Sequence, residues 1–354
     1  MKVRLTHQIP PSENNPRNSE GAFIRGKNGE LLFAYSRYTG ESIHDHAACD
    51  IALIVSDDEG ESWSEPRTIA TAAEFGVKNI MSVSAVEQKN GDIGFYFLIK
   101  ENDSSSTLGR AVSCDGVSFK VERCESKFPK KYYVVNNDRV IRLKDGRLAA
   151  PAAYIPVDCN TEEKHHMPAT MTCLLSDDDG GSFYKADVDY TTKDPVNMRY
   201  GFQEPGALER EDGIYMWART NYGCQYEALF TENFETVIAP RASIFTSPPS
   251  PMHFKWVDGV IYAIYNPVPR YNGVEYSKVT RNRTPYVLRK STDGGESYGP
   301  LNIIENDPER GYCYPAVIGT KDGCLLLAYC RGGEADGNTL CRLGIAKIEI
   351  DSIE

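Results

Sequence analysis

Short apolar runs recur along the chain, and an Asn-Gly or Asp-Gly dipeptide precedes each of them. The glycines of these six dipeptides lie about 59 residues apart on average, at positions 29, 91, 146, 213, 259 and 323. The apolar runs span residues 30–35, 92–99, 147–154, 214–218, 260–265 and 324–329. Asn-Gly and Asp-Gly supply the positive φ that two-residue hairpin turns need. A hairpin repeated at this period predicts an all-β protein built from six copies of one unit.

A second motif, Ser-x-Asp-x-Gly-x-Ser/Thr-aromatic, occurs later in several of these units. It is present at 56–63, 176–183 and 291–298, lacks one residue at 113–119, and is degenerate at 231–236. In such a turn the Asp accepts backbone N–H groups, the Gly permits a tight path and the aromatic ring packs between strands. Acidic turns can bind calcium, but no bidentate Glu follows at the offset of an EF-hand. We therefore interpret this motif, an Asp box, as a marker of the fold.

The period of the hairpins indicates the architecture. A four-stranded propeller blade needs about 40–50 residues plus loops. Six units of about 59 residues therefore predict a six-bladed β-propeller with Asp-box turns, in a single domain over residues 1–354. A strand near residues 2–6 is expected to close the ring against the strand at 344–350. Repeat folds of this kind are the usual exception to the length limit of one domain.

The composition limits the binding partners and the cellular location that are expected. A net charge of −11 and a pI of about 5.2 create a field that repels polyanions, so neither nucleic acid nor a membrane is expected as a partner. No run of 18 apolar residues occurs, and the first residues lack the apolar segment of a signal peptide. The ten cysteines form no CxxC pair and are expected to be free thiols. These features predict a cytoplasmic protein, or a secreted one if a leader has been removed.

One position of each unit is a candidate for the functional site. The innermost strands of a propeller begin at one mouth of the central channel, so residues at a fixed distance before each turn glycine should meet there. Nine residues before the six glycines stand Glu20, Ser82, Asn137, Glu204, Ser250 and Tyr314. A channel mouth is wet and favours polar residues in any case. Two carboxylates and a tyrosine at one mouth are nevertheless the inventory of a catalytic site.

Three arginines are expected on the same rim. Arg37 and Arg219 stand where the second strand of a hairpin ends, and Arg283 precedes the Asp-box strand of the fifth unit. Each of them could be a solvated surface residue. Three arginines on one rim favour the binding of an anion or a sugar.

Histidines and an aspartate lie on two loops. His44, Asp45 and His46 end the loop after the first hairpin, and they are interpreted as a source of a proton or as a polar loop tip. Their spacing fits no standard zinc site, so no metal and no cofactor are expected. His165 and His166 are expected on a polar surface loop.

Together these residues resemble the sialidase superfamily, nearly end to end. The last hairpin lies where sialidases carry a nucleophilic tyrosine, here Tyr314, and Glu204 matches the glutamate that activates it. Asp45 falls in the loop of their acid/base aspartate. Arg219 and Arg283 match two of the three arginines that bind the substrate carboxylate. The resemblance implies a retaining exo-glycosidase that attacks with tyrosine, because an anionic sugar would repel an attacking carboxylate.

The chain departs from that family at one place. Sialidases open with an Arg-Ile-Pro motif that supplies the first arginine, whereas this chain has Ser19 at that position, followed by Glu20. Arg17 or Arg37 could compensate. A carboxylate loses affinity when one of three arginines gives way to a glutamate, so the terminal sugar need not be sialic acid.

Three functions agree with these features. The first is the exo-glycosidase just described, which would remove a terminal sugar from a glycan or oligosaccharide. Its catalytic candidates are Tyr314, Glu204, Asp45 and His46, and its substrate-binding candidates are Arg219, Arg283, Glu20, Arg37, Asn137 and His44. The second is a glycosidase or glycan lyase of different specificity in which His46 or Glu20 does the acid–base work. The third is a non-catalytic carbohydrate-binding propeller, because a fold alone does not imply chemistry.

Overall fold

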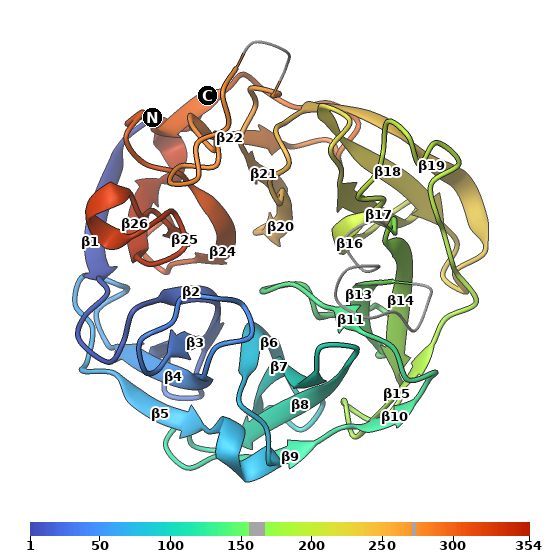
Figure 1. The fold of residues 1–354 in the computed structure, drawn as a ribbon. Coiled ribbons are helices and arrows are strands. Elements are labelled where there is room, and N and C mark those ends of the chain that lie inside the picture. The colour runs from blue at the N-terminus through green and yellow to red at the C-terminus, as the bar shows by residue number, and fades with distance from the viewer. Residues whose placement is uncertain (156–166, 271–273) are drawn as a thin grey trace.

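The structure of the chain is a computed structural model that describes residues 1–155, 167–270 and 274–354. The strands of these residues form six sheets that stand around a common axis like the blades of a propeller (Figure 1). The all-β class and the six-bladed arrangement predicted from the turn period are therefore confirmed. The described residues also form three short 3-10 helices, η1 (Ala72–Phe75), η2 (Glu334–Asp336) and η3 (Ile350–Ser352).

The blades follow one another along the chain. The first blade consists of β2 (Asn18–Arg25), β3 (Leu31–Tyr38), β4 (Cys49–Ser56) and β5 (Arg67–Ala70), and the second of β6 (Ile80–Glu87), β7 (Ile93–Asn102), β8 (Ser105–Ser113) and β9 (Lys120–Arg123). The third consists of β10 (Glu125–Lys127), β11 (Tyr133–Val134), β12 (Ile141–Arg142), β13 (Leu148–Tyr154), β14 (Thr170–Ser176) and β15 (Ser182–Lys185).

The second half of the ring repeats this order. The fourth blade consists of β16 (Gln203–Arg210), β17 (Gly213–Arg219), β18 (Cys224–Phe230) and β19 (Thr236–Thr246), and the fifth of β20 (His253–Val257), β21 (Val260–Tyr265), β22 (Tyr286–Ser291) and β23 (Asn302–Glu305). The sixth consists of β24 (Cys313–Gly319), β25 (Cys324–Cys330), β26 (Leu343–Glu349) and β1 (Val3–Ile9).

The N-terminal strand closes the ring. β1 pairs antiparallel with β26, with Val3 opposite Ile348 and Ile9 opposite Leu343, which confirms the predicted closure. In Figure 1 the blue first strand accordingly lies beside the red last strands. Because the sixth blade combines both ends of the chain, the ring can open only if that sheet comes apart.

The six Asn/Asp-Gly turns join the inner strand of each blade to the next strand, as the sequence predicts, and in the third blade these are the short β12 and β13. Their glycines have φ between 77° and 133°, a region that side-chain-bearing residues rarely enter. At Gly213 a Cβ atom would also lie 2.3 Å from the carbonyl oxygen of Phe230. These turns set where each inner strand ends and therefore which residues, counted back from the turn, reach the channel mouth.

The Asp boxes join the third and fourth strands of their blades. In the first box the Asp58 carboxylate accepts hydrogen bonds from the backbone N–H of Ser62 at 2.9 Å, from the Ser62 hydroxyl at 2.5 Å and from Ser56 Oγ at 2.8 Å. The same bonds surround Asp178 and Asp293. Among residues 1–155, 167–270 and 274–354, no group of three or more His, Cys, Asp or Glu could hold a metal ion.

The hydrophobic core lies between neighbouring blades. Phe33 and Ile54 of the first blade pack with Leu326 and Ala328 of the sixth, and Trp63 of the first Asp box packs against this cluster. Full burial of one such large apolar side chain contributes about 1.5–3 kcal/mol. Packing of this kind holds each blade against the next and gives the channel mouth a fixed geometry.

Nine of the ten cysteines fall within the described residues, and all nine are free thiols, as expected. Cys159 lies outside the described residues. In the same part of the chain, no helix is long and apolar enough to cross a membrane.

Candidate active site

Four of the six inner strands carry a bulge at the position found nine residues before the turn glycine. The pairing register shifts around Glu20 in β2, Ser82 in β6, Glu204 in β16 and Tyr314 in β24. All four residues have φ between 47° and 62°, which is uncommon for residues other than glycine. A bulge redirects the side chain of a strand and is frequent beside active sites. The shared offset therefore has a structural cause.

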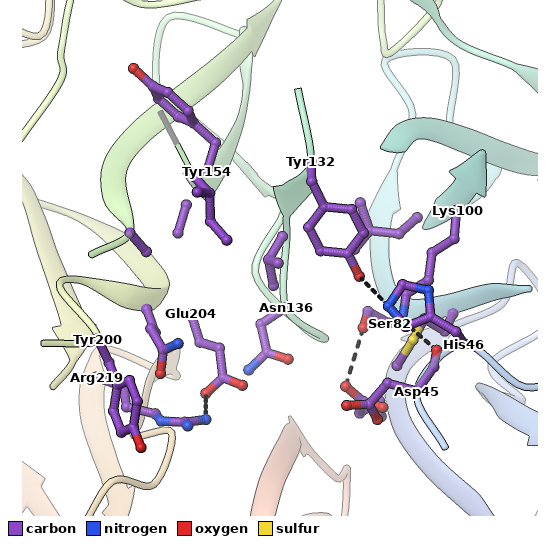
Figure 2. Close-up of a pocket in the computed structure, with 18 of the residues that line it drawn as sticks. Asp45, His46, Ser82, Lys100, Tyr132, Asn136, Tyr154, Tyr200, Glu204 and Arg219 are labelled. Carbon is purple, nitrogen blue, oxygen red and sulfur yellow. Dashed lines mark hydrogen bonds and ion pairs between the residues drawn. The ribbon is translucent and has the colours of Figure 1, made fainter. Parts of the chain in front are cut away.

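These side chains meet in a cavity of about 550 Å³ at one mouth of the channel. Of the ten catalytic and substrate-binding candidates named from the sequence, seven line it: Glu20, His44, Asp45, His46, Glu204, Arg219 and Tyr314. Figure 2 shows Glu204 and Arg219 on one side and Asp45 and His46 on the other. We call the group Tyr314, Glu204, Arg219 and Arg283 the phenol wall. The group Glu20, Asp45, Arg17 and Lys100 is the carboxylate wall.

The phenol wall is centred on the Glu204 carboxylate. Tyr314 Oη donates a hydrogen bond to Glu204 Oε1 at 2.8 Å, and Arg219 Nη1 donates to Glu204 Oε2 at 2.7 Å. The two partners of the first bond stand 110 residues apart in the chain. That bond lies within the range of about 2.6–3.2 Å expected for a nucleophile and its base.

Burial and the arginines act in opposite directions on this pair. Burial and the adjacent Glu204 charge raise the pKa of Tyr314 well above that of an ordinary phenol. Burial alone would also raise the pKa of Glu204, but the charges of Arg219 and Arg283 outweigh it and lower that pKa. The resting site therefore pairs a neutral phenol with an ionised carboxylate that can accept its proton.

Arg283 stands behind the phenol and does not line the cavity. It is 2% exposed, and its guanidinium carbon lies 5.6 Å from the centre of the Tyr314 ring. Its Nη1 donates to Cys313 Sγ at 2.9 Å and its Nη2 to the carbonyl oxygen of Pro249 at 3.2 Å. The charge of Arg283 thus acts on Glu204 and Tyr314 through space.

On the carboxylate wall one arginine is shared by two acids. Arg17, which is 2% exposed, donates to Glu20 Oε2 at 2.9 Å and to Asp45 Oδ1 at 2.5 Å. Ser82 Oγ donates to Glu20 Oε1 at 3.2 Å. Lys100 Nζ donates to the backbone carbonyl oxygen of Asp45. Arg17 thus holds the loop of residues 39–46 against the inner strand of the first blade.

The pKa values of the two acids of this wall are shifted in opposite directions. Burial would raise the pKa of Asp45, but Arg17 and Lys100 outweigh it and hold that pKa well below its usual range. Burial dominates at Glu20 and raises its pKa, although Arg17 opposes the shift. At a pH where Asp45 is ionised, Glu20 is therefore the acid that retains a proton more readily.

Three predicted site residues stand elsewhere. Arg37 lies in β3, opposite Asn18 and Asp50, and does not line the cavity. Asn137 is buried and does not line the cavity, whereas its neighbour Asn136 does. Arg283 lies behind Tyr314, as described above. His165 and His166, which were expected on a surface loop, lie outside the described residues.

The histidines of the 44–46 loop both border the cavity. His46 is half-exposed, and its Nδ1 lies 3.4 Å from Asp103 Oδ1. Its Nε2 lies 3.5 Å from the Tyr132 hydroxyl, and the two rings are 5.8 Å apart. This places His46 between two further side chains rather than against the phenol wall, as Figure 2 also indicates.

Two cations of the site were not predicted from the sequence. Lys100 borders the cavity near the end of β7. Arg37 and Arg219 stand at the corresponding place in their hairpins, so the repeat pattern could also have identified Lys100. Arg281 also lines the cavity. It sits in an irregular segment with φ of 55°, and no repeat pattern marks it.

Comparisons with known proteins agree with this geometry at the level of the fold. A family model described as a BNR repeat-like domain matches residues 29–327 of the chain. No curated protein matches the sequence.

Solved structures of sialidases share the propeller. The Hadza microbial sialidase Hz136 has a TM-score of 0.73 at 14% identity, over 96% of this chain and 67% of that one. The NanB sialidase from Streptococcus pneumoniae has a TM-score of 0.70 at 14% identity, over 99% and 71% of the two chains. A protein of unknown function from Dyadobacter fermentans has a TM-score of 0.70 at 16% identity, over 98% and 99%. At these identities the likeness concerns the fold.

Proposed function

The chain belongs to the family of BNR repeat-like domains, and we propose that it is an exo-acting glycoside hydrolase in which Tyr314 and Glu204 form the nucleophile pair. The observation that carries the proposal is the 2.8 Å hydrogen bond from the buried phenol to a carboxylate that Arg219 and Arg283 keep ionised. A tyrosine held in this way can attack without being ionised beforehand.

The proposed reaction has two steps. Tyr314 Oη bonds to the anomeric carbon of the terminal sugar while Glu204 Oε1 takes the phenolic proton. The bond between the anomeric carbon and the glycosidic oxygen breaks, and that oxygen takes a proton from the carboxylate wall. Water then attacks the anomeric carbon, gives its proton back to that wall, and the Tyr314 oxygen leaves with the proton from Glu204. Two displacements return the original anomeric configuration.

Two acids of the carboxylate wall could supply the proton, and the structure favours Glu20 over Asp45. Both line the cavity. Arg17 pairs with both, but Asp45 also lies beside Lys100, and its pKa is held low. The pKa of Glu20 is raised by burial, which is what a general acid near neutral pH requires. Asp45 and His46 remain as the alternative proton source on the 44–46 loop.

The substrate proposed is a terminal sugar of a glycan or oligosaccharide. The solved sialidase structures that share the fold motivate this class. In the present chain Arg219 and Arg281 border the cavity and could bind an acidic group or hydroxyls of the sugar. Ser19 and Glu20 stand where the family pattern has its first arginine, so a sugar other than sialic acid fits the proposal equally well.

A panel of aryl glycosides that includes sialosides, uronides and neutral sugars tests the proposal. The expected result is turnover of at least one glycoside, with the original anomer as the first product in proton NMR spectra. Inversion of the anomer would exclude a covalent intermediate. Sugar binding by calorimetry without turnover of any glycoside or polysaccharide would identify a non-catalytic carbohydrate-binding propeller. An unsaturated product would identify a lyase.

A further inference from the structure

One buried amide lies between the two walls of the cavity. Asn137 comes from the third blade, in the interval between β11 and β12, and is 1% exposed. Its Nδ2 lies 2.9 Å from the carbonyl oxygen of Gly21, 3.3 Å from that of Tyr314 and 3.2 Å from that of Pro315. A single side chain of the third blade thus joins the inner strands of the first and the sixth.

The next residue fastens the same strand. Asp138 Oδ2 accepts the backbone N–H of Val317 in β24 at 3.2 Å. The same carboxylate lies 3.0 Å from His253 Nε2 and 2.7 Å from Lys255 Nζ in β20. Asp138 has φ of 53°. In this blade the positive φ therefore falls on the residue after Asn137, whereas in four other blades it falls on the residue nine before the turn glycine. This shift of one residue lets the side chains of Asn137 and Asp138 both reach β24.

These contacts supply hydrogen-bond partners to the inner strand of the sixth blade. β24 is the innermost strand of its blade, so the edge that faces the channel has no neighbouring strand to pair with. Buried carbonyl groups without hydrogen-bond partners destabilise the fold, and they leave the strand free to shift. The Asn137 amide has two N–H bonds to offer, and the carbonyl of the proposed nucleophile is one of their acceptors.

We propose that Asn137 is a positioning residue that holds Tyr314 against Glu204 and fixes the separation between Tyr314 and Glu20. This inference rests on the proposed function. The amide reaches the backbone of Tyr314 on the phenol wall and of Gly21, which follows Glu20, on the carboxylate wall. Asn137 does not line the cavity, so it acts through these backbones rather than on the sugar.

Two variants separate this role from simple filling of space. Asn137→Ala removes the donor and the volume. Asn137→Asp keeps the shape but offers at most one donor, and only when its carboxyl is protonated. The matched control is Asn302→Ala on the outer strand β23, where a buried amide, 6% exposed, also donates to two carbonyl oxygens, each at 3.2 Å.

Kinetics on a glycoside that the wild type cleaves give the first readout. A misplacement of about 1 Å can lower a rate about 100-fold. We expect a loss of that order in kcat for Asn137→Ala with KM changed little, because no sugar contact is removed. Asn137→Asp should lose activity at high pH and regain part of it as the pH falls. Asn302→Ala should keep wild-type kcat at a comparable loss of thermal stability.

A crystal structure of each folded variant gives a readout that needs no substrate. Tyr314 Oη should move beyond hydrogen-bond reach of Glu204 Oε1. A distance that stays near 2.8 Å, a kcat within about threefold of wild type, or a loss equal to that of Asn302→Ala would overturn the inference. Failure of both Asn137 variants to fold would also overturn it, because the amide would then serve the fold alone. If the wild type cleaves no glycoside, the proposed function fails while the crystallographic distance still decides this point.

Discussion

Both walls of the cavity combine carboxylates with cations, and they differ in how the charges are shared. On the phenol wall Glu204 is the one carboxylate that pairs with Arg219 among the described residues, and Arg283 adds a second positive charge nearby. On the carboxylate wall the Arg17 guanidinium pairs with both Glu20 and Asp45. An acid with its own cation stays ionised, whereas of two acids that share one, the more buried holds its proton longer.

This difference gives each wall a separate chemical task. The lowered pKa of Glu204 suits a base that takes a proton from the phenol. The raised pKa of Glu20 suits an acid that gives a proton to a leaving oxygen. Two titratable groups whose surroundings push their pKa values apart are the usual sign of an acid–base pair.

The largest effect is expected on the phenol wall. Tyr314→Phe removes the proposed nucleophilic oxygen and leaves the ring packed beside Arg283. Turnover of the wild-type substrate should fall by roughly three or more powers of ten, because the covalent step has no substitute. Thermal melting is the control and should change little. Turnover near the wild-type level would transfer the chemistry to Glu20, Asp45 and His46.

An intermediate effect is expected when the proton donor is changed. Glu20→Gln should lower kcat about 100-fold or more on substrates with a poor leaving group. The kcat on substrates whose leaving group needs no proton, such as dinitrophenyl glycosides, should change little. If Asp45→Asn rather than Glu20→Gln shows this dependence on the leaving group, the assignment of the two acids is wrong.

The pH profile tests the same contrast between walls. Glu204 must be ionised to act as a base, so activity should fall as the pH drops through its lowered pKa. Glu20 must be protonated to act as an acid, so activity should fall as the pH rises through its raised pKa. The charge of Asp45 helps to raise the pKa of Glu20. Asp45→Asn should therefore move the alkaline limb to lower pH, and an unmoved limb would contradict the shared-arginine account.

The smallest effect on catalysis is expected away from both walls. Asp178 accepts three hydrogen bonds within its Asp box. Asp178→Ala should lower the free energy of unfolding by about 1–3 kcal/mol, because these donors lose their acceptor. The turnover of the folded protein should stay at the wild-type level. A loss of kcat without a loss of stability would give this motif a role beyond the fold.

The phenol wall was accessible from the sequence and the carboxylate wall was only partly so. The hairpin repeat places Glu20, Glu204 and Tyr314 at one offset, and a repeated bulge turns their side chains to one mouth. Arg17 precedes the first inner strand and Asp45 belongs to a loop, so no repeat could pair them. Their contact depends on how the loop folds back over the first blade.

The direction of the Asn137 side chain could not be predicted from its offset before the turn glycine. Counting back from the turn glycine selects it, but the inner strand of the third blade is split between β11 and β12. The positive φ falls on Asp138 instead, and the amide turns to the backbone of the neighbouring blades. A fixed offset predicts the side-chain direction only where the strand is continuous.

The most direct test of the account is to locate the covalent intermediate. A fluorinated, activated glycoside of the sugar that the wild type cleaves slows the second step and lets the glycosyl-enzyme accumulate. We expect a mass increase of one glycosyl unit, carried by the peptide that contains Tyr314 and absent from Tyr314→Phe. A label on Glu20, Glu204 or Asp45, or turnover with inversion and no label, would contradict it.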